Sequence, residues 1–192
     1  MTPFGILADD LTGASDTGVQ FSRQGARVAV LVTPQSRPRL EPGAWDVVVL
    51  NTESRQTSPA EAERRVRHGL RFLAENGWPL RYKKVDSTLR GNLVAELRPI
   101  MQATAPTPVH AAALSIKQST AESIVGSATP DGPRLVLAPA FPLAARTVEQ
   151  GVLLVNGVPV AETEIGQDRL SPVLESHIPT LLRSGMGDGL GR

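Results

Sequence analysis

The ten residues KKVDSTLRGN, at positions 83–92, bring together side chains that suit the binding of a polyhydroxylated acid. Lysine and arginine donate hydrogen bonds to carboxylates, and arginine can do so in a bidentate manner. Aspartate and serine exchange hydrogen bonds with hydroxyl groups. The same residue types would also suit a solvated turn, so the interpretation depends on what the fold places beside them.

Two further polar clusters occur in the sequence, ADDLTGASD at 8–16 and NTESR at 51–55. Each of the three clusters lies at the end of a predicted strand, FGIL at 4–7, DVVVL at 46–50 or LRYKKV at 80–85. In an open parallel sheet, ligands bind in the crevice beyond the carboxyl ends of the strands. We therefore expect one site at this edge, and its candidate side chains are Asp9, Asp10, Asn51, Glu53, Arg55, Lys84, Asp86, Ser87, Arg90 and Asn92.

Each candidate also has a purely structural explanation when it is taken alone. Asp10 could cap a helix, because aspartate is a favoured N-cap residue. Asp86 and Ser87 suit a turn, Arg90 could be solvated, and Asn92 could cap the next helix. We favour a site because three clusters coincide at one edge, where two helix N-termini would also attract an anion.

The strands that must position these side chains alternate with helical segments. Short apolar runs predict strands at 4–7, 26–33, 46–50, 80–85 and 134–139. Helical patterns occupy 12–25, 58–77 and 92–103. The alternation predicts an α/β fold, with a mostly parallel open sheet flanked by helices. Asn156 and Gly157, between two apolar runs, predict an antiparallel β-hairpin over 152–163, near the C-terminal end.

The helix termini carry their own signals. Ser58 is expected to cap the second helix, and Glu61 would complete a capping box with it. Asn92 is expected to cap the third helix, and Pro99 should kink or end that helix.

Residues 103–133 do not fit the alternating pattern. They are rich in Ala, Ser, Thr and Pro and contain little apolar bulk, so they have little surface to bury. We expect this segment to be the least ordered part of the chain, as a mobile insertion, although part of it could form a helix over 109–125.

The composition excludes several classes of function. A net charge of +1 and 4% aromatic residues are unlike a nucleic-acid-binding protein. The chain has no cysteine, so it has no disulfide and no thiolate metal site. The three histidines lack metal-ligand spacing, so no metal site is expected. We see neither a signal peptide nor a membrane-spanning run, which leads us to expect a cytoplasmic protein without a membrane partner.

The three polar clusters also carry a family resemblance. ADDLTGASDTG, NTESR and YKKVDSTLRGN resemble the N-terminal, substrate-binding domain of the four-carbon acid sugar kinases. This family includes the tetronate and 3-oxo-tetronate kinases. APAFPLAARTVEQGVLLVNGVPVAETEIGQD and SPVLESHIPTLL resemble the second half of the same domain. The resemblance covers 1–102 and 134–184, and it implies one acid-sugar-binding domain over 1–184.

The resemblance implies ATP-dependent phosphorylation of a four-carbon acid of the threonate, erythronate or oxo-tetronate type. The implied substrate contacts are Asp10 in preference to Asp9, together with Arg55, Lys84, Val85, Asp86 and Ser87, and Arg90 and Asn92 complete the predicted site. Arg55 and Lys84 would hold the carboxylate of the acid. Asp10, Asp86 and Ser87 would bind its hydroxyl groups, and one of the two aspartates would take the proton of the reacting hydroxyl.

Members of this family normally continue into a second, nucleotide-binding domain, whereas this sequence stops at RSGMGDGLGR. The chain contains no GxGxxG and no GxxxxGK[ST] motif, so we expect ATP and Mg²⁺ to bind mainly the second domain. Residues 185–192 are interpreted as a tail or a severed linker. We expect this chain alone to bind a sugar acid weakly and not to phosphorylate it.

Two other functions remain open at the level of the sequence. The chain could be a stand-alone sugar-acid binding module that does no chemistry. Less favoured is a hydrolase that uses Asp9 and Asp10 to hold a divalent metal ion.

Overall fold

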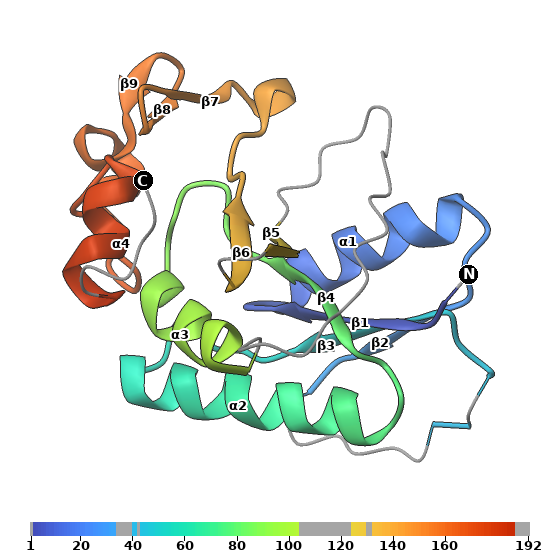
Figure 1. Ribbon diagram of the computed structural model, residues 1–192. Helices are drawn as coiled ribbons and strands as arrows, with labels where there is room; N and C mark the ends of the chain where they lie inside the picture. Colours follow the sequence, from blue (N-terminus) through green and yellow to red (C-terminus); the bar gives the residue numbers. More distant parts are fainter. Residues whose placement is uncertain (1, 34–39, 42, 104–123, 130–131, 187–192) are drawn as a thin grey trace.

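The fold is built around four parallel strands, seen in a computed structural model that describes residues 2–33, 40–41, 43–103, 124–129 and 132–186. The strands lie in the order β2-β3-β1-β4 (Figure 1). They are β1 (Phe4–Ala8), β2 (Val28–Leu31), β3 (Val47–Asn51) and β4 (Leu80–Lys84). Helices α1 (Leu11–Arg23) and α2 (Pro59–Glu75) cover opposite faces of the sheet, and α3 (Leu93–Ala103) lies against α2. The predicted α/β fold is confirmed.

The central strands are buried on both faces. Leu7 and Leu50 pack in one cluster with Leu73 of α2. Ile6 and the alternate residues of β3 pack on the other face in a second cluster that includes Ala14 of α1. A parallel strand that is covered on both sides reads as a continuous apolar run, which explains why β3 shows no alternation in the sequence.

The connections of β1 and β3 diverge at the C-terminal edge of the sheet. β1 and β3 are adjacent and in register from Phe4↔Val47 to Ala8↔Asn51. The chain leaves β1 into α1 on one face and leaves β3 into α2 on the other face. Because the two connections diverge, the C-terminal ends of β1 and β3 form a topological switch point of the sheet. Ligands of open α/β sheets bind at such points.

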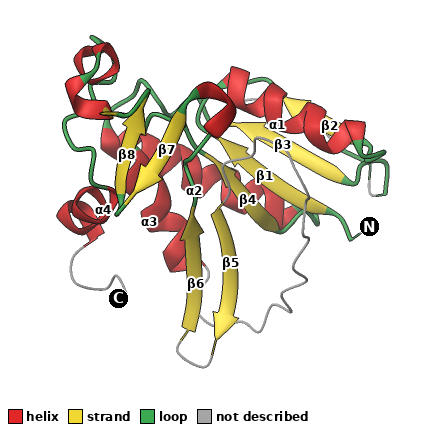
Figure 2. Ribbon diagram, turned by 90° about the horizontal axis from the view of Figure 1, so that it is seen from above, coloured by secondary structure: helices red, strands yellow, loops and turns green. Residues whose placement is uncertain are grey.

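Two antiparallel units follow the parallel sheet (Figure 2). The first contains β5 (Ile124–Thr129) and β6 (Gly132–Leu137) and lies beside β4. β6 was predicted as a strand, but it pairs with β5 and not with the parallel sheet. The second unit contains β7 (Arg146–Glu149), β8 (Val152–Val155) and β9 (Val158–Pro159).

The predicted hairpin is present between β8 and β9. Its turn residues Asn156 and Gly157 both have positive φ, 52° and 79°, as a type I′ turn requires. The remaining elements are three 3-10 helices and one α-helix, namely η1 (Pro142–Ala144), η2 (Val160–Glu162), η3 (Glu164–Gln167) and α4 (Ile178–Met186). None of the described helices combines the length and the apolarity that crossing a bilayer requires.

The helix ends differ in part from the predictions. Ser58 caps α2 as expected, and its Oγ accepts a hydrogen bond of 3.3 Å from the backbone N of Glu61. The Glu61 carboxylate, however, binds the guanidinium groups of Arg64 and Arg65 and does not complete a capping box. Pro99 does not end α3, which continues to Ala103.

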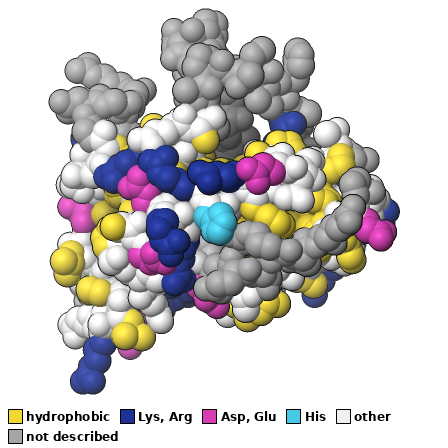
Figure 3. All heavy atoms as spheres, turned by 90° about the horizontal axis from the view of Figure 1, so that it is seen from below, with side chains coloured by type: hydrophobic (Ala, Val, Ile, Leu, Met, Phe, Trp, Pro, Cys, Tyr) yellow, Lys and Arg dark blue, Asp and Glu magenta, His cyan; other side chains and the backbone are white. Residues whose placement is uncertain are grey.

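The outer face of α2 is covered by ion pairs between helix residues. Arg64 pairs with Glu61, and both Arg67 and Arg98 pair with Glu63. Figure 3, which looks at the protein from below, shows such Lys and Arg side chains with acidic side chains among them. Exposed pairs of this kind contribute little to stability individually, so this face is best explained as a solvated one.

The predicted atypical segment and the predicted C-terminal tail each include some described residues. Residue 103 belongs to α3, and 124–129 with 132–133 lie in the β5–β6 hairpin. The helix proposed over 109–125 lies outside the described residues except for 124 and 125, which are in β5. Residues 185 and 186 belong to α4, where Arg98 Nη2 donates to the carbonyl of Gly185 at 2.7 Å, and 187–192 lie outside the described residues.

The N-terminal edge of the sheet is closed by tightly packed aromatic residues. Trp78 is 2% exposed, and its Nε1 donates a hydrogen bond of 3.2 Å to the carbonyl of Trp45. Gly5 of β1 lies directly against this corner. A Cβ atom at Gly5 would come within 2.7 Å of both the Trp78 carbonyl oxygen and a methyl group of Leu73.

We therefore expect Gly5→Ala to lower the free energy of unfolding by about 1–3 kcal/mol, because the extra methyl overpacks a buried corner. Urea denaturation followed by circular dichroism measures this loss. Ser15→Ala, at an exposed position of α1, is the control and should change stability by less than about 0.5 kcal/mol. Equal midpoints for the two variants would contradict the prediction.

Candidate functional site

The guanidinium group of Arg55 joins the polar clusters that follow β1, β3 and β4. Its Nε lies 2.7 Å from Asp9 Oδ2, and its Nη1 lies 2.7 Å from Asp10 Oδ2. Its Nη2 lies 3.8 Å from Asp86 Oδ1. The Arg55 side chain is only 14% exposed, so these pairs are weakly screened and stronger than pairs on the surface. The structure thus brings the three predicted clusters together.

The two aspartates after β1 differ in accessibility. Asp9 is buried, and its Oδ1 has no hydrogen-bond partner among the described residues. Asp10 caps α1, because its Oδ1 accepts a hydrogen bond of 2.8 Å from Gly13 N, yet its side chain remains 27% exposed. The structural explanation of Asp10 as a helix cap is therefore correct, and it does not remove Asp10 from the site.

Asp86 is the most strongly hydrogen-bonded carboxylate of the site. It accepts bonds from Thr88 Oγ1 and from Nε, Nη2 and the backbone N of Arg90, at 2.8, 3.1 and 3.3 Å for the arginine. Burial by itself raises the pKa of Asp86, but the bonds from Arg90 and Thr88 and the charge of Arg55 outweigh it and hold the pKa well below its usual range. Asp86 is therefore ionised and a weak proton acceptor.

The lysines at the end of β4 have different roles. Lys83 is buried, and its Nζ forms a 2.7 Å ion pair with Oε2 of Glu96 on α3, which is buried as well. This pair was not predicted from the sequence. Lys84 Nζ donates a hydrogen bond of 2.6 Å to the carbonyl of Val85. The stem of Lys84 passes close to Gly13, where a Cβ atom would lie 3.3 Å from Lys84 Cγ.

Two of the predicted residues, Asn51 and Asn92, hold loops in place. Asn51 donates to the carbonyl of Val32 at 2.7 Å, and its Oδ1 accepts from the backbone N of Glu53 at 3.0 Å. The Glu53 side chain is exposed. Asn92, expected to cap α3 through its side chain, instead donates to two carbonyls of the loop that carries Arg55, those of Ser54 and Thr57, at 2.8 Å each.

The loop before α3 packs directly on Arg55. Gly91 has a φ of 97°, and a Cβ atom there would lie 3.0 Å from Arg55 Cγ. Only glycine combines this backbone conformation with so close an approach.

The C-terminal part of the chain adds two charged side chains that sequence reasoning did not single out. Asp168 Oδ2 lies 3.6 Å from Nη1 of Arg90. Arg146 Nη1 donates a hydrogen bond to the hydroxyl of Ser87, which is buried. The only signal for both residues was their position in the segment 138–168 that carries the family resemblance.

The carboxylates of the site are arranged around an arginine and not around a metal ion. Asp9 and Asp10 both direct an oxygen at Arg55. Within the described ranges, no group of three or more His, Cys, Asp or Glu side chains has an arrangement that could hold a metal. Because both aspartates are paired with Arg55, their arrangement offers no support for a hydrolase that holds a metal ion on Asp9 and Asp10.

A cavity of about 260 Å³ is lined by the loop before α3 and by α3 itself. Its lining includes Leu89, Val173, Leu181 and Arg98. None of the three aspartates of the site lines this cavity, and neither does Arg55. We therefore place the candidate site at the strand ends, where hydroxyl, carboxylate and guanidinium groups converge.

Comparison with protein families matches residues 4–192 to the sugar-binding N-terminal domain. The chain belongs to this family. It is 39% identical over 180 residues to a D-threonate kinase of Bordetella bronchiseptica, a match that covers 93% of this chain and 38% of the relative. It is 31% identical over 186 residues to a D-erythronate kinase of Heliobacterium modesticaldum, covering 97% and 37% of the two chains. The chain therefore spans well under half the length of these relatives.

The fold also matches a solved structure. A domain-of-unknown-function protein from Bordetella bronchiseptica, described as a domain-swapped dimer with bound citrate, is 35% identical and superposes with a TM-score of 0.71. The match covers 93% of this chain and 39% of that chain.

The lowered pKa of Asp86 predicts a pH-dependent contribution to stability. Asp86→Asn should lower the free energy of unfolding by about 2–4 kcal/mol at neutral pH, because Arg90 and Arg55 lose a charged partner. A folded-state pKa below the unfolded value of about 3.9 stabilises the protein above that pH, and this stabilisation is lost as the pH falls further. The difference between wild type and variant should therefore narrow from about pH 5 toward about pH 2.

Chemical denaturation at several pH values measures this difference. Asp16→Asn, at an exposed position of α1, is the matched control and should show a small difference at every pH. If the difference in free energy of unfolding between wild type and Asp86→Asn stays constant down to about pH 2, the charge of Asp86 does not stabilise the fold.

Proposed function

We propose that Arg55 and its partners Asp9, Asp10 and Asp86, called the Arg55 cluster below, bind the four-carbon sugar acid of an ATP-dependent kinase. In this proposal, residues 1–184 form the acid-sugar-binding domain of that kinase. The observation that carries the proposal is the convergence of three strand ends on one guanidinium group at the switch point of a parallel sheet. The proposal is supported by the membership of the family and by the kinases among the relatives. Citrate, bound in the related structure, is also a hydroxylated carboxylic acid.

Within this proposal, Asp10 is the group that takes the proton of the reacting hydroxyl. It is the more exposed of the two aspartates after β1, and each carboxylate oxygen has a further lone pair for a ligand hydroxyl. Asp86 is a weak base because its pKa is held low. We assign Asp86 to positioning, together with Ser87 and Val85 on the wall formed by the same loop.

Arg55 is hydrogen-bonded to two carboxylates of the protein itself. Its Nε and Nη1 already bind Asp9 and Asp10, so a bidentate grip on the ligand would require those bonds to break. We therefore assign Arg55 to the orientation of Asp10 and not to the bidentate ligand contact expected from the sequence. Lys84, at the end of β4, remains a candidate for a direct contact with the acid.

ATP and Mg²⁺ would bind outside the described residues. Phosphoryl transfer needs a cradle for the phosphates and their metal ion, and the described part of the chain offers neither a glycine-rich loop nor a metal cluster. The relatives extend well beyond the part that this chain matches. We propose that the nucleotide binds mainly in that further part.

Arg55→Ala should weaken the binding of threonate or erythronate by about 1.5–3 kcal/mol, because Asp10 loses the charge-assisted hydrogen bond that orients it, and bonds to charged groups lie in this range. Isothermal titration calorimetry on the 192-residue chain measures this loss. Arg27→Ala is the matched control, because Arg27 forms its ion pair with Asp46 at the opposite edge of the sheet and is exposed. Unchanged affinity in Arg55→Ala, with an intact circular dichroism spectrum, would reject the site.

The 192-residue chain alone should not consume ATP in the presence of four-carbon acids. The chain should support turnover once the nucleotide-binding part of a related kinase is supplied separately, since closure of a second domain completes such sites. Coupled measurement of ADP formation follows both cases. Turnover by the chain alone would mean that it contains its own nucleotide site, whereas acid binding without turnover in either case would favour a binding module.

A further inference from the structure

Arg146, the first residue of β7, is a cation of the site whose charge no carboxylate of the described residues balances. Its Nη1 donates to the hydroxyl of Ser87, while its Nε is buried and has no hydrogen-bond partner among the described residues. A buried donor without a partner is unfavourable, and a ligand that supplies an acceptor relieves that cost.

The other arginines of the site are already neutralised. Arg55 contacts Asp9, Asp10 and Asp86, and Arg90 contacts Asp86 and Asp168. An acid that binds at this edge of the sheet meets three aspartates, which repel its carboxylate. Binding therefore needs a cation whose charge is not already balanced, and Arg146 has this property.

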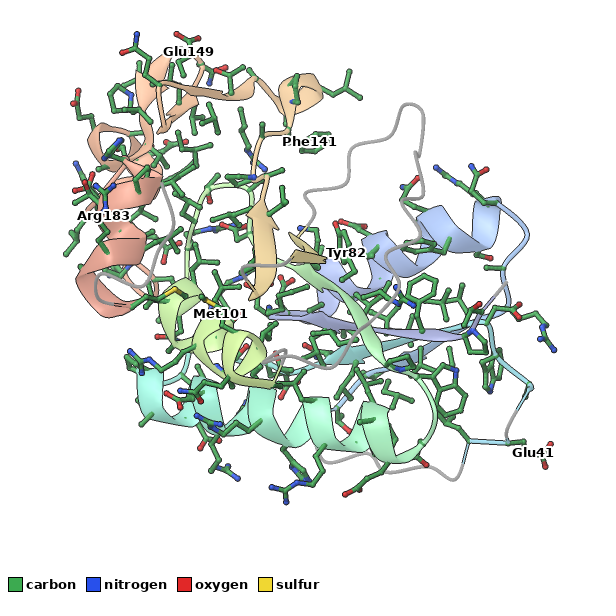
Figure 4. All side chains as sticks on the ribbon, viewed as in Figure 1. Glu41, Tyr82, Met101, Phe141, Glu149 and Arg183 are labelled. Carbon is green, nitrogen blue, oxygen red and sulfur yellow. The ribbon has the colours of Figure 1, made fainter. Side chains whose placement is uncertain are left out.

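The backbone holds Arg146 in a fixed position. Arg146 and Phe141 exchange two backbone hydrogen bonds, of 2.9 and 3.1 Å, across the turn formed by η1. Ala145, in that turn, has a left-handed φ of 53°, and its carbonyl accepts from Asn156 N at 2.8 Å. Phe141, labelled in Figure 4, lies on the connection between β6 and β7. A side chain on so constrained a turn is suited to orient a ligand.

We propose that Arg146 binds the carboxylate of the sugar acid and thereby selects acids over uncharged polyols. This inference rests on the proposed function of the Arg55 cluster. Ser87 assists, because its hydroxyl accepts a hydrogen bond from Arg146 and its own proton is then available to a ligand oxygen. Arg146 and Asp10 would hold opposite ends of the acid, with the carboxylate toward β7 and the reacting hydroxyl toward α1.

The test is isothermal titration calorimetry of the 192-residue chain with threonate and with erythronate. Arg146→Ala and Arg146→Gln should each weaken acid binding at least about tenfold, as expected for the loss of a charge-assisted hydrogen bond. Arg146→Lys keeps the charge and should lose less than Arg146→Gln. Arg183→Ala, on the exposed side of α4 (Figure 4), is the matched control and should bind like the wild type.

A loss of acid affinity smaller than about tenfold in Arg146→Gln overturns the inference. It is also overturned if Arg146→Lys loses as much affinity as Arg146→Gln, because the charge of residue 146 would then play no part. If Arg146→Ala does not fold, the comparison of Arg146→Gln with Arg146→Lys decides alone. A wild-type chain that binds neither acid overturns the proposed function itself, which separates the two failures.

Discussion

The attraction between one largely buried guanidinium group and three carboxylates holds the C-terminal edge of the sheet together. Asp9, Asp10 and Asp86 would repel one another at these separations, and Arg55 converts that repulsion into a set of fixed contacts. The surrounding loops are shaped to this group. Gly91 leaves room for the Arg55 stem, and Asn92 binds the carbonyls of the loop that carries it.

A buried ion pair between Lys83 of β4 and Glu96 of α3 also lies at the C-terminal edge of the sheet. Lys83 and Glu96 fix the end of β4 to the first turns of α3, so the loop between them is held at both ends. A buried pair offsets its loss of hydration only when hydrogen bonds satisfy both partners, and Oε1 of Glu96 has no partner among the described residues. The ion pair therefore accounts for the position of the loop and not for added stability.

The strand ends of the site could be predicted because buried strands leave apolar runs in the sequence and parallel strands bring their carboxyl ends to one edge. Local signals were less reliable when a side chain could bind a partner other than the expected one. Glu61 binds arginines of its own helix, and the Asn92 amide binds a loop 35–38 residues away. Arg146 could not be predicted because its contact with Ser87 joins residues 59 positions apart, and no periodic pattern records such a contact.

The tryptophans occupy the end of the sheet that the site does not use. Trp45 and Trp78, the two tryptophans of the chain, precede β3 and β4, whereas the site follows these strands. The buried indole of Trp78, bonded to the Trp45 carbonyl, senses the packing of that corner. Tryptophan fluorescence should therefore change when the protein unfolds but hardly change when a ligand binds. A spectroscopic measurement of ligand binding would need an added probe, for example a fluorophore on β7.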